Sequence, residues 1–175
     1  MSKLTIAEVN ALSPEAFATR FGFLFEHSPW VAQGAAGRRP FETLGAMQAA
    51  LARELFFATD AQKLAVFRAH PKLADKAAIQ EGLTKESASE QASAGLDALT
   101  PEEFAQFNAF NGAYDDRFGF PFIIAVRAAG GKAGVLNAMT ARLSNSDAQE
   151  RRNALDEVVK IVGLRLQDVV EGELV

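Results

Sequence analysis

The sequence contains no cysteine. This absence excludes disulfide bonds, thiolate nucleophiles and every zinc or iron–sulfur site that depends on cysteine ligands. It also fits a protein of a reducing compartment. Histidine is scarce as well, because His27 and His70 are the only two in the chain. With so few histidines, and no carboxylate-rich metal motif, the sequence predicts no metal site.

Long apolar runs are also missing. The longest, residues 120–126, is far shorter than the roughly 18 residues that span a membrane. Residues 1–20 lack the basic-then-apolar layout of a secretory signal, so we expect a cytoplasmic protein. Neither sign of charge dominates, since 18 lysines and arginines face 22 aspartates and glutamates, a net charge of −4. We therefore expect no membrane partner and no nucleic-acid partner.

Several catalytic and nucleotide-binding motifs are absent too. The chain has no Gly-x-x-x-x-Gly-Lys loop, no Gly-x-Gly-x-x-Gly turn and no Gly-x-Ser-x-Gly elbow, which argues against nucleotide binding and serine-hydrolase chemistry. What the chain does have is the size and composition of one folded unit, with 175 residues, 49% hydrophobic and 23% charged. We expect residues 1–175 to form one compact domain.

The sequence indicates most clearly where helices begin. Hydroxyl or carboxylate residues precede proline or acidic residues, and apolar side chains then recur three and four positions apart. The expected starts are Ser13, Pro40, Asp60, Thr84, Thr100 and Ser146. The segment 117–122 contains Gly119 and Pro121, so we expect an irregular, buried crossing there. No segment alternates with period 2, and the sequence predicts an all-α fold of about seven to nine helices.

Polar residues at the expected helix ends are the candidates for chemistry. A helix should stop at His70, because Pro71 disfavours a helical residue before it. His70 is then either a cationic cap of that helix or a functional group. Ser87, Glu90 and Gln91 are either part of a capping box or part of a site.

Two arginines and the second histidine complete this set. Arg117 and Arg127 flank the irregular crossing, where each is either a surface charge or a fork of donors suited to a carboxylate or urea-like oxygen. His27 is interpreted as a partly buried structural histidine beside Trp30.

These signals occur together and in order, and their combination resembles one family, the 2-oxo-4-hydroxy-4-carboxy-5-ureidoimidazoline (OHCU) decarboxylases of urate breakdown. The matching pieces cover most of residues 25–127. They are Phe25-Glu26-His27-Ser28-Pro29-Trp30, His70-Pro71-x-Leu73, Ser87-x-x-Glu90-Gln91-x-x-Ala94-Gly95-Leu96, Phe107-x-x-x-Asn111-x-x-Tyr114-x-x-Arg117-Phe118-Gly119-Phe120-Pro121-Phe122-Ile123 and Ala125-Val126-Arg127.

The resemblance implies an all-helical homodimer that converts the ureidoimidazoline to (S)-allantoin without a cofactor or metal. On the family pattern, His70 and Glu90 match the catalytic pair. The residues that match substrate-holding positions are Pro71, Ser87, Gln91, Phe122, Ile124 and Arg127, with Arg117 as the fallback for the arginine.

Two rival hypotheses remain at this stage. One is an enzyme of the same fold that acts on another ureido or carboxylated ring, because specificity depends on a few pocket contacts. The other is a helical interaction module without catalysis, which should display an exposed apolar patch.

Overall fold

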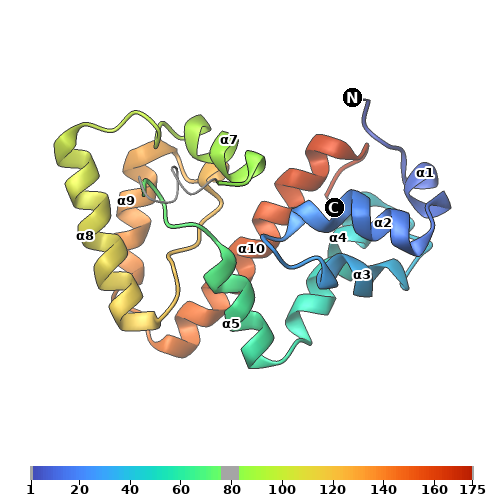
Figure 1. Cartoon of the computed structure of the whole chain (residues 1–175), viewed down its shortest axis with the longest axis horizontal. Helices are drawn as coiled ribbons and strands as arrows, with labels where there is room; N and C mark the ends of the chain where they lie inside the picture. Colours follow the sequence, from blue (N-terminus) through green and yellow to red (C-terminus); the bar gives the residue numbers. More distant parts are fainter. Residues whose placement is uncertain (1, 76–82, 175) are drawn as a thin grey trace. The chain divides into compact units, whose positions relative to one another are not determined.

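The computed structural model describes residues 2–75 and 83–174 (Figure 1). This part of the chain contains nine α-helices and two short 3-10 helices. Its β-structure is a single isolated bridge between Leu4 and Val170. The predicted all-α class and the predicted number of helices are therefore confirmed for the described residues. None of the helices in these two ranges is long and apolar enough to cross a membrane.

The described chain groups into two compact units. Unit 1 comprises the residues up to Ala69 and from Val158 onward, and unit 2 comprises His70–Glu157. The helix α10 (Asp147–Val169) contributes its first part to unit 2 and its second part to unit 1. The prediction of one domain over residues 1–175 stays a prediction.

Unit 1 contains five further helices, whose starts follow local capping. They are α1 (Ile6–Ala11), α2 (Pro14–Phe21), α3 (Trp30–Ala36), α4 (Leu44–Phe56) and α5 (Asp60–Ala69), with the 3-10 helix η1 (Gly22–Leu24) after α2. The hydroxyl of Ser13 accepts a hydrogen bond from the Ala16 N–H at 3.1 Å, as the predicted cap of α2 should. α3 packs against both α2 and α4.

Three predictions in unit 1 are wrong in detail. Pro40 does not start a helix, because α4 begins at Leu44 and Thr43 provides its cap. The cap of α5 is Thr59 and not Asp60, since the Gln62 N–H donates to the Thr59 hydroxyl at 3.3 Å. His27 is exposed rather than partly buried, and its φ of 48° places it in the left-handed region.

Within unit 1, a buried ion pair connects the segment that follows η1 to α10. Arg165 Nη2 lies 2.8 Å from Glu26 Oε1, and both side chains are almost fully buried. Arg165 Nη1 also donates to the backbone carbonyls of Phe23 and Leu24, at 3.2 and 3.3 Å. The pair thus links residues about 140 positions apart in the sequence.

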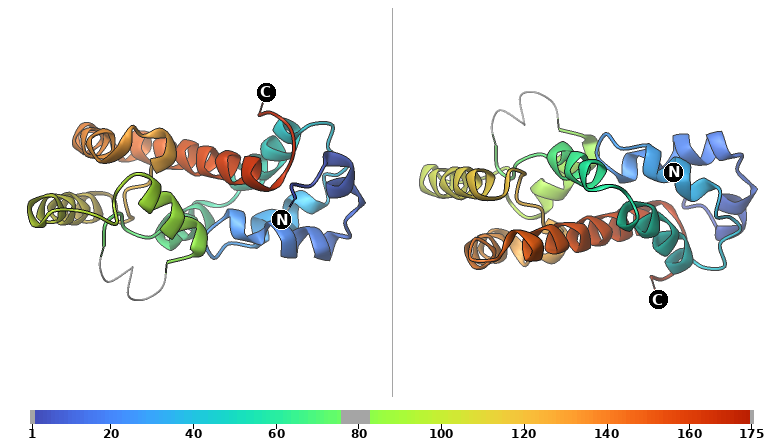
Figure 2. Two further views of the ribbon diagram at one scale, coloured as in Figure 1. Left: turned by 90° about the horizontal axis from the view of Figure 1, so that it is seen from above. Right: turned by 90° about the horizontal axis from the view of Figure 1, so that it is seen from below.

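Unit 2 contains the elements that carry the candidate site. They are α7 (Lys85–Ser93), α8 (Pro101–Phe118), the 3-10 helix η2 (Val126–Ala128), α9 (Gly131–Arg142) and the first part of α10. The predicted helix start at Thr100 is confirmed, and Thr100 and Glu103 form a capping box with hydrogen bonds of 2.9 and 3.2 Å. α8 and α9 pack against each other (Figure 2).

The irregular crossing is shorter at its start than expected. Arg117 and Phe118 belong to the last turn of α8, which ends at Gly119. Gly119 has a φ of 72° and donates its N–H to the Asp115 carbonyl at 2.8 Å, a glycine C-cap. The prediction that residues 117–122 are all irregular is therefore wrong at its first two positions. We call residues 119–125, which connect α8 to η2, the crossing segment.

Candidate active site

The structure places all of the predicted site residues in unit 2. Three of them lie on α7, which Thr84 caps by accepting a hydrogen bond from the Ser87 N–H at 3.2 Å. Ser87 therefore lies inside the helix, and its interpretation as a capping residue is wrong. Ser87 and Gln91 are four positions apart and share the buried face of α7, each 5% exposed, whereas Glu90 is half-buried.

The loop that follows α5 carries His70 and Pro71. α5 ends at Ala69, as predicted from Pro71, and the His70 side chain is 8% exposed. Two amide side chains hold the end of this loop. The Ala74 N–H donates to Gln91 Oε1 at 3.0 Å, and Asn111 Nδ2 donates to the Leu73 carbonyl at 2.8 Å. The loop is thus attached to both α7 and α8, close in sequence to His70.

The crossing segment and η2 carry the remaining predicted residues. The Phe122 side chain is buried, and its ring lies edge-on to Tyr114 with 5.2 Å between the ring centroids. Ile124 is half-buried. Arg127 is exposed on η2, and η2 packs against α7, the helix of Ser87, Glu90 and Gln91.

Arg117 occupies a different part of unit 2. It lies in the last turn of α8, where its Nη2 donates to the Asn145 carbonyl at 2.9 Å. Figure 1 shows α7 and this end of α8 at opposite ends of unit 2. The structure therefore brings Arg127, and not Arg117, to the helix that carries the other candidates.

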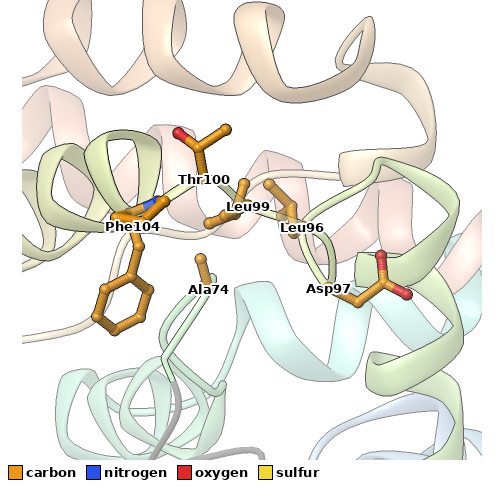
Figure 3. Close-up of a pocket in the computed structure, with 7 residues that line it drawn as sticks. Ala74, Leu96, Asp97, Leu99, Thr100 and Phe104 are labelled. Atoms are coloured by element: carbon orange, nitrogen blue, oxygen red, sulfur yellow. The ribbon is translucent and has the colours of Figure 1, made fainter.

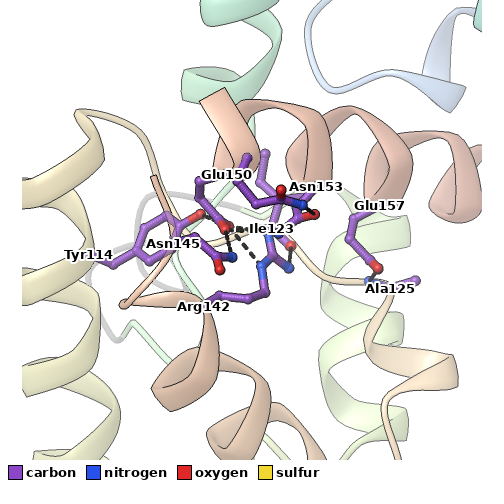
Figure 4. Close-up of polar contacts among 9 residues, drawn as sticks. Tyr114, Ile123, Ala125, Arg142, Asn145, Glu150, Asn153 and Glu157 are labelled. Atoms are coloured by element: carbon purple, nitrogen blue, oxygen red, sulfur yellow. Dashed lines mark hydrogen bonds and ion pairs between the residues drawn. The ribbon is translucent and has the colours of Figure 1, made fainter. Parts of the chain in front are cut away.

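A buried polar network lies beneath the crossing segment (Figure 4). The Glu150 carboxylate is fully buried and accepts hydrogen bonds from the Tyr114 hydroxyl, from Arg142 Nε at 2.7 Å and from Asn145 Nδ2 at 2.8 Å. Burial acts to raise the pKa of Glu150, but the hydrogen bonds from Arg142, Tyr114 and Asn145 outweigh it and lower that pKa. Glu150 is therefore an anion at neutral pH.

The pKa of Tyr114, which donates a hydrogen bond to this carboxylate, is raised and not lowered. Burial, followed by the hydrogen bond to Glu150, raises the pKa of the Tyr114 hydroxyl well above its usual range. Tyr114 is therefore a fixed hydrogen-bond donor. From the sequence, Tyr114 is known only as part of the family motif, and Arg142, Glu150 and Glu157 are not among the predicted site residues. The acidic residues of α10 carried no local signal that distinguished them from a solvated helix face.

A cavity of about 260 Å³ lies beside Ala74 (Figure 3). Its lining is Ala74, Leu96, Asp97, Leu99, Thr100, Pro101 and Phe104. None of these is a predicted site residue. Within residues 2–75 and 83–174, no three histidine or acidic side chains are grouped as ligands for a metal ion.

Comparisons with known proteins identify the family of the chain. The family model described as OHCU decarboxylase matches residues 10–167. The chain therefore belongs to the OHCU decarboxylase family.

Individual relatives agree with this assignment. The chain is 39% identical to the 2-oxo-4-hydroxy-4-carboxy-5-ureidoimidazoline decarboxylase of Haloferax volcanii, over 99% of this chain and all of that one. It is 32% identical to the uric acid degradation bifunctional protein PucL of Bacillus subtilis, over 95% of this chain and 33% of that one. A crystal structure of (S)-allantoin synthase matches with a TM-score of 0.76 and 31% identity, over 95% of this chain and 54% of that one.

Proposed function

We propose that this protein decarboxylates OHCU to (S)-allantoin during uric acid degradation, as a carbon–carbon lyase that needs no cofactor. The observation that carries the proposal is the full-length match to the Haloferax volcanii decarboxylase. The family model matches residues 10–167, a range that includes every candidate site residue. The placement of the His70 loop, α7 and η2 in one unit supports it.

The substrate supplies the chemistry that a cofactor provides in other decarboxylases. When the bond between the ring carbon and the carboxylate breaks, carbon dioxide leaves and the bonding electron pair stays on the ring. Conjugation to the neighbouring imine and carbonyl spreads this charge. The protein must then orient the ring, place donors where negative charge develops and direct one proton to a single face.

The residues of unit 2 match these tasks. In the proposed site, His70 holds the substrate hydroxyl or carboxylate and transfers a proton, because imidazole changes charge near neutral pH. Arg127 is the proposed fork of donors for a carboxylate or urea oxygen. Pro71, Ser87, Gln91, Phe122 and Ile124 are proposed to complete the substrate contacts. Because the Phe122 ring is buried against Tyr114 and beneath Arg142, its proposed contribution comes from its backbone.

The test generates OHCU from urate by the two preceding reactions and follows its disappearance by ultraviolet absorbance and circular dichroism, with a metal chelator present. We expect rapid formation of optically active allantoin. For His70→Asn we expect at least about a hundredfold lower turnover, the usual scale for a proton-transferring group.

Folded wild-type protein that does not exceed the spontaneous, racemic reaction would contradict the proposed function. It would favour an enzyme of the same fold with another ureido ring as substrate. A His70→Asn variant with normal turnover would remove His70 from the mechanism.

Two further parts of the proposal are the homodimer and the cytoplasmic location. Sedimentation equilibrium of the purified chain tests the first, and fractionation of the native cells tests the second. If the active protein is a monomer at the assay concentration, the proposed homodimer is wrong and the activity does not require it.

A further inference from the structure

We propose that Arg142 and Glu157 are positioning residues that hold the crossing segment at two successive peptide groups, and so set the location of Ile124 and Arg127. This inference rests on the proposed function. Neither side chain touches the reacting atoms in this proposal; each acts through the backbone of the crossing segment.

Arg142 contacts the first of the two peptide groups. Its Nη1 donates to the Ile123 carbonyl at 2.8 Å, and its guanidinium lies over the Phe122 ring, 4.5 Å from the centroid. The same guanidinium donates from Nε to Glu150 at 2.7 Å. Because the guanidinium is planar and rigid, these three contacts fix the peptide relative to α9 and α10.

Glu157 contacts the second peptide group. Its carboxylate accepts a hydrogen bond from the Ala125 N–H at 2.8 Å (Figure 4). Ile124 therefore lies between a carbonyl that α9 holds and an N–H that α10 holds. Val126 begins η2 directly after Ala125, so the same bond also sets the start of the short helix that carries Arg127.

The position of the Arg142 guanidinium is fixed because its counter-ion, Glu150, is itself held by several hydrogen bonds. The Glu150 carboxylate is fully buried and also accepts hydrogen bonds from the Tyr114 hydroxyl and from Asn153 Nδ2, the latter at 3.1 Å. A buried ion pair is an inefficient way to stabilise a fold, because its desolvation offsets most of its attraction. A geometric role explains this arrangement better than stability does.

The experiment compares conservative and non-conservative variants at each position. Glu157→Gln keeps an oxygen that can accept the Ala125 N–H, whereas Glu157→Met does not. Arg142→Lys keeps the charge beside Glu150, but one ammonium group cannot reproduce the planar contacts with Ile123 and Phe122. Lys132→Met, which removes a partly exposed ion pair with Glu103 on the same α9 helix, is the control.

We expect Glu157→Gln and Lys132→Met to keep turnover within about threefold of wild type. Glu157→Met and Arg142→Lys should fold but lose about 10- to 100-fold in kcat, with a smaller change in KM, because misplaced binding groups mainly impair the reactive geometry. Amide hydrogen exchange should accelerate at Ala125 in Glu157→Met and stay slow in Glu157→Gln.

The outcomes separate this inference from the proposed function. An active wild type together with active, folded Glu157→Met and Arg142→Lys would overturn the positioning role alone. An inactive wild type would overturn both. If Arg142→Lys does not fold, the Glu157 pair decides, since equal kcat values for Glu157→Gln and Glu157→Met would contradict the proposal.

Discussion

Gln91 Oε1 accepts a hydrogen bond from the Ala74 N–H at 3.0 Å, so a side chain of α7 holds the loop that begins with His70. Ala74 has a φ of 57°, a left-handed conformation that is unfavourable for alanine. The surrounding contacts must therefore stabilise this conformation. Gln91 has a structural partner in addition to its proposed contact with the substrate.

Gln91→Met should reduce both stability and turnover. The substitution preserves the length of the side chain but leaves the Ala74 N–H without this acceptor, at a cost of about 1–3 kcal/mol. Urea unfolding and the decarboxylation assay measure the two effects. Ser93→Ala, at an exposed position of the same helix, is the control and should change stability by less than about 0.5 kcal/mol. Unchanged stability of Gln91→Met would show that the bond does not hold the loop.

Glu90→Gln distinguishes two roles for the proposed catalytic carboxylate. If Glu90 repels the substrate carboxylate, that repulsion disappears as carbon dioxide leaves. Glu90 then accelerates the reaction because it raises the free energy of the bound substrate relative to the transition state. The variant should then turn over more slowly yet bind a carboxylated analogue of the substrate more tightly, as measured by calorimetry. Weaker binding would reject repulsion and favour a Glu90 that orients His70.

Alkaline pH should destabilise unit 2 through Tyr114. Burial, with the hydrogen bond to Glu150, raises the pKa of this hydroxyl. A group with a raised pKa contributes its full stabilisation below the unfolded value, about pH 10 for tyrosine, and loses it as the pH rises further. Tyr114 is the only tyrosine, so tyrosinate absorbance reports it directly.

We therefore expect Tyr114 to ionise late and together with unfolding of unit 2. The chain also has a single tryptophan, Trp30 in unit 1, whose fluorescence provides a separate signal. A simple titration near pH 10 with retained helical circular dichroism would contradict the buried position of Tyr114.

Breaking the Glu26–Arg165 pair should destabilise the protein strongly. Removal of one partner leaves a buried charge without its counter-ion, which costs about 3–5 kcal/mol. Glu26→Gln, followed by denaturant unfolding with Trp30 fluorescence, measures this cost. The control is Arg38→Met, which removes a more exposed ion pair with Glu54 in the same unit and should cost less than about 1 kcal/mol. Equal effects of the two substitutions would show that burial does not distinguish the pairs.

Gly134→Ala should destabilise the start of α9. A methyl group at Gly134 would collide with the backbone carbonyl oxygen of Ala129, the residue directly after η2. Gly112→Ala in α8 meets no atom within 4 Å and should stabilise the helix by up to about 1 kcal/mol. Thermal unfolding of both variants measures the difference. A Gly134→Ala variant as stable as wild type would mean that η2 shifts freely, together with Arg127.

Local chemistry explains which parts of the fold could be predicted from the sequence. The helix start at Thr100 and the helix stop before Pro71 depend on neighbouring residues, and both predictions are confirmed. α3 was missed because its cap position, Pro29, makes no side-chain hydrogen bond and its residues are mostly small. Pro40 was misassigned because proline suits a turn as well as a helix start.

The candidate site also has one part that local sequence indicates and another part that depends on tertiary contacts. The local pattern Ser87-x-x-Glu90-Gln91 identifies these residues as candidates, and the structure places Ser87 and Gln91 on the buried face of α7. The contacts of Arg142 with Ile123 and of Glu157 with Ala125 join residues 19 and 32 positions apart. Nothing in the local sequence links such residues, because tertiary packing alone brings them together.

The discontinuity of unit 1 has a consequence for synthesis on the ribosome. Unit 2 is one continuous stretch of chain, whereas unit 1 combines an early segment with residues that are translated last. Leu4 forms backbone hydrogen bonds with Val169 and Glu171, at 2.9 and 2.8 Å, and Glu26 receives its counter-ion from Arg165. The helices of residues 2–69 therefore cannot complete their packing until the second part of α10 has left the ribosome. All residues of unit 2 are translated before that point. Nascent chains that end at Glu157 and continue into an unstructured linker longer than the exit tunnel should already protect residues 70–75 from proteolysis, while residues 2–69 remain cleavable.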